Sequence, residues 1–190
     1  MEVPSRTDAR HRWRARASRS DPTPDPGSPS SASLSIKVSS GAGSGPTRLA
    51  AFDAALMACG VADFNLVRLS SVIPPAADVV EVSRDEQHQG GHGDLLFCVY
   101  ADAYSSTPGE LAWSGIAWAL RNDGSKSGLF VEHSGLSEAL LYRDLHASLD
   151  SMSASRGGMY DTAGEAAISA LCVDHPVCAL VIAAYRTAAW

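Results

Sequence analysis

Two adjacent serines end a short alternating run and are followed closely by two prolines. Ser70 and Ser71 follow residues 63–69 and precede Val-Ile-Pro-Pro, and Asn65 lies on the same run. If the backbone is strained here, the Ser71 hydroxyl can attack the carbonyl of Ser70 and convert the amide into an ester. Elimination then splits the chain and leaves a pyruvoyl group at the new N-terminus, with the Asn65 amide as a candidate oxyanion donor. From spacing alone, an ordinary polar strand end is the simpler interpretation.

Other candidate motifs do not meet the requirements of the chemistry that they suggest. The glycine-rich run 41–45 precedes a helix, but Pro46 breaks the GxGxxG spacing and no Gly-Lys-Ser/Thr follows, so we expect a mobile loop. The sequence contains neither a GxSxG elbow nor an HExxH pair. Cys172, His175 and Cys178 are metal-binding residue types, but they lie in or between apolar runs with no evident fourth ligand. We therefore expect no metal site.

The composition limits the classes of function. The chain has 190 residues, 45% of them hydrophobic, and a formal net charge of −6, which suits one domain and excludes a large multidomain enzyme. Residues 35–190 hold nine basic and 17 acidic side chains. This acidic balance argues against nucleic-acid or anionic-membrane partners, and no run of about 18 apolar residues could span a bilayer. The four cysteines lie among apolar residues, which favours reduced thiols and a cytoplasmic protein.

The first 34 residues differ from the rest in composition. They hold six arginines and four acidic residues, are rich in serine and proline, and contain little apolar surface. Because such a segment cannot offset its ordering entropy by burial, we expect residues 1–34 to be disordered. The alternating arginines between residues 10 and 16 suit a solvated tail or a nucleic-acid arm, and a solvated tail is the simpler interpretation. The absence of an apolar stretch after them argues against a secretory signal, whereas an organelle transit peptide stays open.

Hydrophobic periodicity divides residues 35–190 into strands and two long helices. The first helix, 48–59, lies between an N-cap at Thr47 and a stop at Gly60, with an apolar stripe that includes Leu49. The second helix, 136–153, repeats leucine at helical spacing from Leu136 onward. Strands are predicted at residues 35–39, 63–69, 95–104, 111–121, 128–133, 165–174 and 177–187. This pattern indicates an α+β domain with helices on layered, mostly antiparallel sheets, and not a doubly wound parallel fold.

Several segments together resemble the pyruvoyl-dependent arginine decarboxylases. The Asn65–Val80 stretch, NLVRLSSVIPPAADVV, is similar to the self-cleavage region of that family. The similarity extends in the same order over most of residues 35–190, at segments 51–56, 107–110, 115–120, 128–135 and 173–175. The resemblance implies an α/β/β/α sandwich whose subunits form a homotrimer or a dimer of trimers.

The resemblance also assigns roles to individual residues. Ser71 would become the pyruvoyl group and Ser70 the new C-terminus, which gives chains 1–70 and 71–190. Asn65 would assist this cleavage, and Glu132 would donate the proton in the decarboxylation. Asp53 would bind the substrate guanidinium from a neighbouring subunit. Gly43, where some members carry a serine, would lie near the substrate loop.

The activity implied by the resemblance is the decarboxylation of L-arginine to agmatine and CO2, through an imine to the pyruvoyl group. In this scheme the cofactor is covalent and comes from the chain itself. Two alternatives stay open at this point. The same group could act on another amino acid, or the chain could be an unprocessed relative without catalytic activity.

Overall fold

The computed structural model describes residues 33–190. The expectations of disorder and of an arginine-rich arm in segment 1–34 lie, except for its last two residues, outside the described residues. Within the described part, no helix combines the length and the apolar character needed to cross a membrane.

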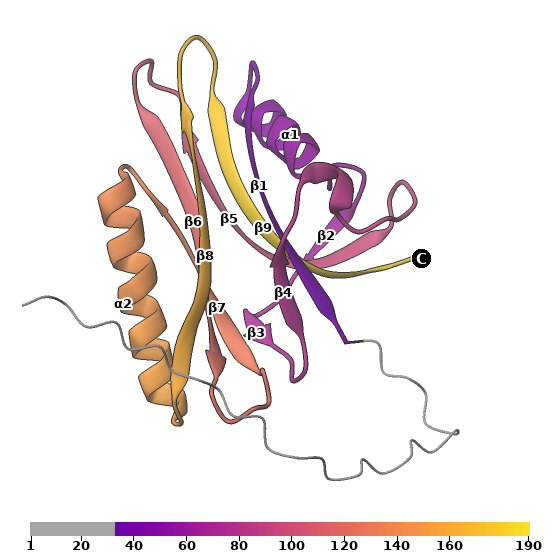
Figure 1. Cartoon of the computed structure of the whole chain (residues 1–190). Coiled ribbons are helices and arrows are strands. Elements are labelled where there is room, and N and C mark those ends of the chain that lie inside the picture. Colours follow the sequence, from indigo (N-terminus) through magenta and orange to yellow (C-terminus); the bar gives the residue numbers. More distant parts are fainter. Residues whose placement is uncertain (1–32) are drawn as a thin grey trace, which may run out of the picture. The chain divides into compact units, whose positions relative to one another are not determined.

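Two β-sheets face each other and each carries one helix on its outer side (Figure 1). The five-stranded sheet has the order β2 (Asn65–Arg68), β5 (Leu95–Ser105), β9 (Val177–Ala188), β1 (Ser35–Ser44), β4 (Asp78–Glu81). The four-stranded sheet has the order β3 (Val72–Ile73), β7 (Gly128–Gly135), β6 (Leu111–Arg121), β8 (Tyr160–Leu171). Helix α1 (Arg48–Cys59) covers the first sheet, helix α2 (Glu138–Arg156) covers the second, and a 3-10 turn spans Arg84–Glu86.

Most strand pairs are antiparallel, and only β1–β4 and β2–β5 among the described pairs are parallel. The predicted α+β class with layered, mostly antiparallel sheets is therefore confirmed. Four apolar clusters of the described residues fill the three spaces between these four layers. The layer between the sheets is centred on large side chains that are almost fully buried, among them Ile36, Val99, Ile116, Trp118 and Phe130.

Residues 41–44 of the glycine-rich run are part of strand β1, and the prediction of a mobile loop there was wrong. All positions from Lys37 to Ser44 pair with β9. Helix α1 packs directly on this strand, and a Cβ at Gly41 would lie 2.8 Å from the Ala55 carbonyl oxygen. The glycines therefore allow a helix and a strand to approach more closely than side chains would permit.

Both predicted helices are present, but their apolar stripes are narrower than expected. Thr47 caps α1 by accepting a hydrogen bond from the Ala50 backbone N–H at 3.1 Å, and Gly60 ends it with a positive φ of 79°. Leu49 and Leu136, which the periodicity assigned to these stripes, are 77% and 79% exposed. Strands β3, of two residues, and β4, of four residues, were not predicted.

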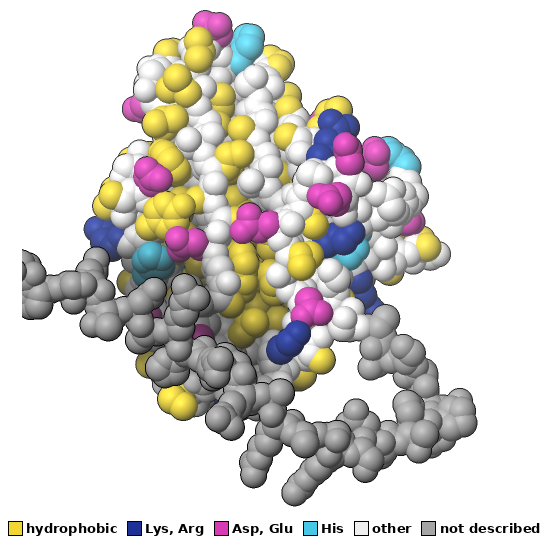
Figure 2. Space-filling model, in the orientation of Figure 1, with side chains coloured by type: hydrophobic (Ala, Val, Ile, Leu, Met, Phe, Trp, Pro, Cys, Tyr) yellow, Lys and Arg dark blue, Asp and Glu magenta, His cyan; other side chains and the backbone are white. Residues whose placement is uncertain are grey.

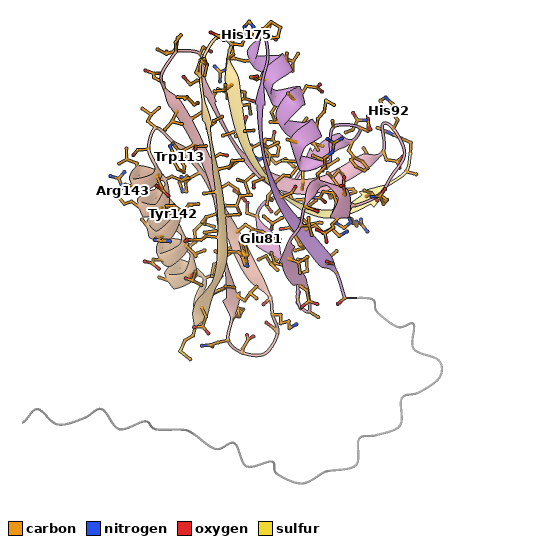
Figure 3. All side chains as sticks on the ribbon, turned by 45° about the horizontal axis from the view of Figure 1, so that its top comes forward. Glu81, His92, Trp113, Tyr142, Arg143 and His175 are labelled. Atoms are coloured by element: carbon orange, nitrogen blue, oxygen red, sulfur yellow. The ribbon has the colours of Figure 1, made fainter. Side chains whose placement is uncertain are left out.

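The four cysteines are buried and unpaired, as expected. Burial raises the pKa of the Cys59 thiol to about 12, so this side chain is a neutral, inert part of the core. Cys172 and Cys178 belong to different apolar clusters, and Figure 3 places His92 and His175 in separate loops. Among residues 33–190 no three His, Cys, Asp or Glu side chains gather in a way that could hold a metal ion.

Candidate active site

The two serines lie where the chain crosses from one sheet to the other. Strand β2 belongs to the five-stranded sheet and β3 to the four-stranded sheet, so residues 69–71 form the crossing. Just before the crossing, the Leu69 N–H donates to the Cys98 carbonyl at 2.9 Å. Just after it, the Phe130 N–H donates to the Ser71 carbonyl at 2.9 Å. The Ser70–Ser71 peptide is thus anchored to a different sheet on each side.

Ser71 has a left-handed backbone conformation, with a φ of 59°. A residue with a Cβ is disfavoured in this region by about 1–2 kcal/mol, because Cβ approaches the following carbonyl oxygen. The hydrogen bonds on both sides of the crossing hold Ser71 in place despite this strain. The strained backbone that the proposed serine chemistry requires is therefore present at the second serine.

The side chain of Ser71 points to Glu132. Its Oγ donates a hydrogen bond to Oε1 of Glu132 at 2.6 Å, and both residues are half-buried. Glu132 lies on β7, directly opposite Ile116 of β6. A short hydrogen bond to a carboxylate is among the stronger ones in proteins, and this geometry lets Glu132 accept the proton of an attacking hydroxyl. Sequence spacing does not reveal this pair, because 61 positions separate the two residues.

A groove runs from Glu132 along the open edge of the sandwich. A cavity of about 100 Å³ beside Glu132 is also lined by Arg68, Asp102 and Ser134. Asp102 and Ser134 also line a larger cavity of about 420 Å³, which includes Tyr104. The two cavities therefore meet at these shared residues.

The other predicted site residues lie elsewhere in this chain. The Asn65 amide donates to the Gly93 carbonyl at 2.7 Å, at the opposite end of β2 from Ser70. Asp53 is exposed on α1 and lines a separate cavity of about 640 Å³. Gly43 lies beneath α1, where a Cβ would overlap the backbone nitrogen of Ala55. The structure thus brings Ser71 and Glu132 together, while the roles expected for Asn65, Asp53 and Gly43 stay predictions.

The sequence matches the model of a known protein family. A family model described as Pyruvoyl-dependent arginine decarboxylase (PvlArgDC) matches residues 35–186. The chain belongs to this family. The match covers both serines, Glu132 and nearly all of the two sheets, so the geometry described above belongs to the part of the chain that defines the family.

Curated relatives carry the same description. The pyruvoyl-dependent arginine decarboxylase of Methanocaldococcus jannaschii is 36% identical over 91 residues, which cover 48% of this chain and 52% of the relative. That of Halobacterium salinarum is 45% identical over 87 residues, covering 46% and 52%. Pyruvoyl-dependent arginine decarboxylase 1 of Methanosarcina mazei is 34% identical over 102 residues, covering 54% and 61%. The chain spans about half the length of the curated relatives that it matches.

Tyr185, on β9, contacts the residue that follows Ser71, and the sequence did not single it out. It is 4% exposed, and its hydroxyl donates to the Val72 carbonyl at 3.0 Å. Burial, and secondarily the negative charge of Glu132, raise the pKa of this phenol, so it is a neutral donor. Its ring meets Phe130 edge-on at 6.1 Å between centroids. The only sequence signal was a single tyrosine in an alanine-rich terminal strand.

Proposed function

We propose that this chain cuts itself between Ser70 and Ser71 and decarboxylates L-arginine to agmatine and CO2. Chains 1–70 and 71–190 would result, and residue 71 would carry the pyruvoyl group. The observation that supports this most directly is the strained Ser71, with its hydroxyl 2.6 Å from Glu132, in a chain of this family.

The first step is an acyl shift within the chain. The Ser71 hydroxyl attacks the Ser70 carbonyl carbon, the Ser70–Ser71 C–N bond breaks, and an ester replaces the amide. Elimination from the ester releases Ser70 as a carboxylate, and hydrolysis with loss of ammonia leaves a ketone at residue 71. Glu132 is placed to take the hydroxyl proton. Asn65 would assist as an amide donor, which requires its side chain to leave the Gly93 carbonyl.

The residues around position 71 suit the group that would form there. The Phe130 N–H, from the four-stranded sheet, holds the carbonyl of residue 71, and the Tyr185 hydroxyl, from the five-stranded sheet, holds that of residue 72. These two contacts would keep the segment fixed after cleavage. The pyruvoyl ketone supplies the carbonyl that binds the substrate amine and the electron sink for loss of CO2. Glu132, next to residue 71, would then donate a proton to the carbon that has lost CO2.

Substrate binding would involve more than one subunit. Asp53 is exposed on α1 and lines a different cavity from Glu132 in its own chain, so it would bind the guanidinium of an arginine held by a neighbouring subunit, in bidentate fashion. Gly43 would act by letting α1 lie close to β1, which fixes the position of Asp53. We propose a homotrimer or a dimer of trimers for this reason. The unpaired, buried cysteines suit a reducing compartment, and we place the enzyme in the cytoplasm.

Denaturing mass spectrometry tests the proposal directly. The wild-type chain should yield fragments 1–70 and 71–190, the second blocked at its N-terminus and reactive with a carbonyl reagent. Ser71→Ala should remain a single chain that releases no CO2 from labelled arginine, and Ser106→Ala, in an exposed turn, should behave like the wild type. An uncut wild-type chain, or a cut and active Ser71→Ala variant, would refute self-processing at this position.

A further inference from the structure

The groove next to Glu132 continues past the ends of two short strands. Strand β2 pairs only with Leu95–Cys98 of β5, and β3 pairs only with the first two residues of β7. The remaining lengths of β5 and β7 therefore have free edges, and the cavities of about 100 and 420 Å³ lie between them. From Glu132 to Ser134 the strand rises about 7 Å, which is comparable to the length of an extended arginine side chain.

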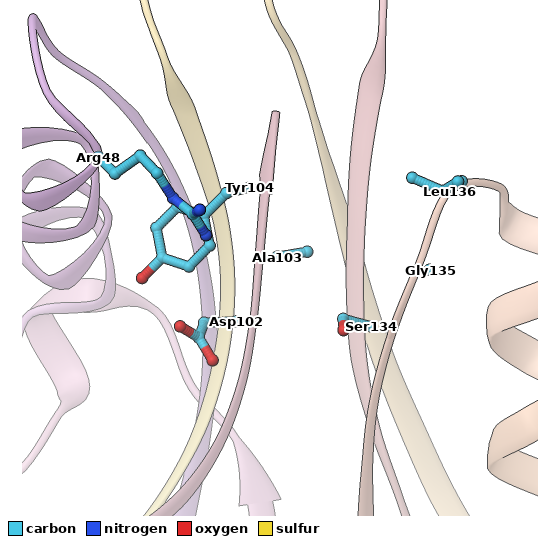
Figure 4. A pocket seen from close by; sticks show the side chains of 7 residues that line it. All are labelled: Arg48, Asp102, Ala103, Tyr104, Ser134, Gly135 and Leu136. Carbon is cyan, nitrogen blue, oxygen red and sulfur yellow. The ribbon is translucent and has the colours of Figure 1, made fainter. Parts of the chain in front are cut away.

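The larger cavity already accommodates a guanidinium group from the chain itself. Arg48, the first residue of α1, places its guanidinium carbon 4.3 Å from the centroid of the Tyr104 ring. Figure 4 shows this guanidinium over the ring, with the Asp102 carboxylate from the same strand nearby. Arg48 is exposed and, among the described residues, forms no ion pair within 4.0 Å. The aromatic face of Tyr104 therefore already holds a guanidinium, and the Asp102 carboxylate lines the same cavity more than 4.0 Å from it.

We propose that Tyr104 and Asp102 form a guanidinium-binding subsite for the substrate, and that Arg48 occupies it when arginine is absent. This inference rests on the proposed decarboxylation of arginine. A planar guanidinium stacks on an aromatic face and uses its N–H edges for a carboxylate, so both residues can act on one ligand. Because a guanidinium has more than one donor edge, Asp102 can bind it together with Asp53 of a neighbouring subunit.

Arg48 is the same chemical group as the ligand, so it competes with the substrate. Its side chain is exposed and held by one cation–π contact, which is a weak interaction at an exposed site. An incoming arginine displaces it and gains the hydrogen bonds to Asp102. Removing Arg48 should therefore strengthen substrate binding, whereas removing the Asp102 charge should weaken it.

Isothermal titration calorimetry on the uncut Ser71→Ala chain separates binding from turnover. Relative to this background, Asp102→Asn should weaken arginine binding about tenfold or more, since hydrogen bonds to charged groups are worth that much. Arg48→Ala should tighten binding about threefold. Citrulline, whose side chain ends in a neutral urea, should bind weakly and respond little to Asp102→Asn. Asp150→Asn, an exposed carboxylate on α2, is the matched control and should leave the Kd unchanged.

The same substitutions in the self-processed enzyme provide an independent readout. Asp102→Asn should raise the KM for arginine with little change in kcat, while mass spectrometry still finds fragments 1–70 and 71–190. Equal Kd values for the Asp102→Asn and Asp150→Asn variants would overturn the subsite. Should Asp102→Asn fail to fold, an unchanged Kd in Arg48→Ala would overturn it as well. If the wild type cuts itself and consumes arginine but neither variant shifts binding, only this inference fails; an uncut, inactive wild type refutes the proposed function too.

Discussion

Strain at Ser71 can be measured as stability in chains that cannot cut themselves. Ser71→Ala keeps a Cβ at a φ of 59°, whereas Ser71→Gly removes it, and both lose the hydroxyl that would attack Ser70. Relief of the left-handed strain should stabilise the glycine variant by about 1–2 kcal/mol. Glycine also gives the unfolded chain more conformational freedom than alanine, which lowers the free energy of unfolding of Ser71→Gly by about 0.4–1 kcal/mol. The net difference is therefore small, and a control is needed to isolate the strain.

Ser70 provides this control. It has no positive φ and is exposed, so Ser70→Gly compared with Ser70→Ala, both in the Ser71→Ala background, measures the unfolded-state effect alone. The free energy of unfolding of each variant is determined by urea denaturation at one protein concentration. The Gly-minus-Ala difference at position 71, less the same difference at position 70, should be about 1–2 kcal/mol. Ala76→Gly, at a φ of 58° in an exposed turn, should show a similar gain without any catalytic role. A double difference near zero would refute strain at Ser71 as a contribution to cleavage.

Three further substitutions test the roles proposed for the site. Glu132→Gln should still cut but more slowly, because an amide oxygen accepts a hydrogen bond from Ser71 but cannot take its proton, and should release CO2 about 10²–10⁴-fold more slowly; unchanged turnover would remove Glu132 from the acid role. Asp53→Asn should raise the KM for arginine about tenfold or more with little effect on kcat, and an unchanged KM would exclude it as a guanidinium ligand. Gly43→Ala should destabilise the chain by about 1–3 kcal/mol in urea denaturation, because the added Cβ overlaps the Ala55 backbone; wild-type stability would mean that α1 can shift.

The long elements could be predicted from the sequence because each has a local signal. Thr47 and Gly60 mark the ends of α1, and the structure confirms both caps. The predicted bounds of β6 at residues 111–121 coincide with those observed, since turn residues flank an apolar run. The run 41–45 was misjudged because glycine is rare in strands, and only the contact with α1 explains it. Such a contact is tertiary and leaves no periodic pattern.

The site could be predicted only in part, and mainly through the family resemblance. The serine pair was recognisable as possible chemistry, but an ordinary strand end fitted the spacing better. The approach of Ser71 to Glu132 depends on β3 joining β7, a two-residue pairing that no sequence pattern indicates. Tyr185 was missed because its contact with Val72 crosses between the sheets over 113 positions. The acidic side chains on the face in Figure 2 are interspersed with apolar, polar and basic ones.

The fold would tolerate the proposed chain break between Ser70 and Ser71. The segment before the break contains β1, α1 and β2, all of which lie in or against the five-stranded sheet. Strand β1 lies between β9 and β4, and β2 pairs with β5, so the proposed cleavage would leave both backbone pairing and apolar burial in place. These strand pairings do not depend on the Ser70–Ser71 peptide bond. Because the surrounding sheets hold Ser71 independently of the Ser70–Ser71 bond, they could impose strain before the proposed cleavage and keep residue 71 beside Glu132 after it.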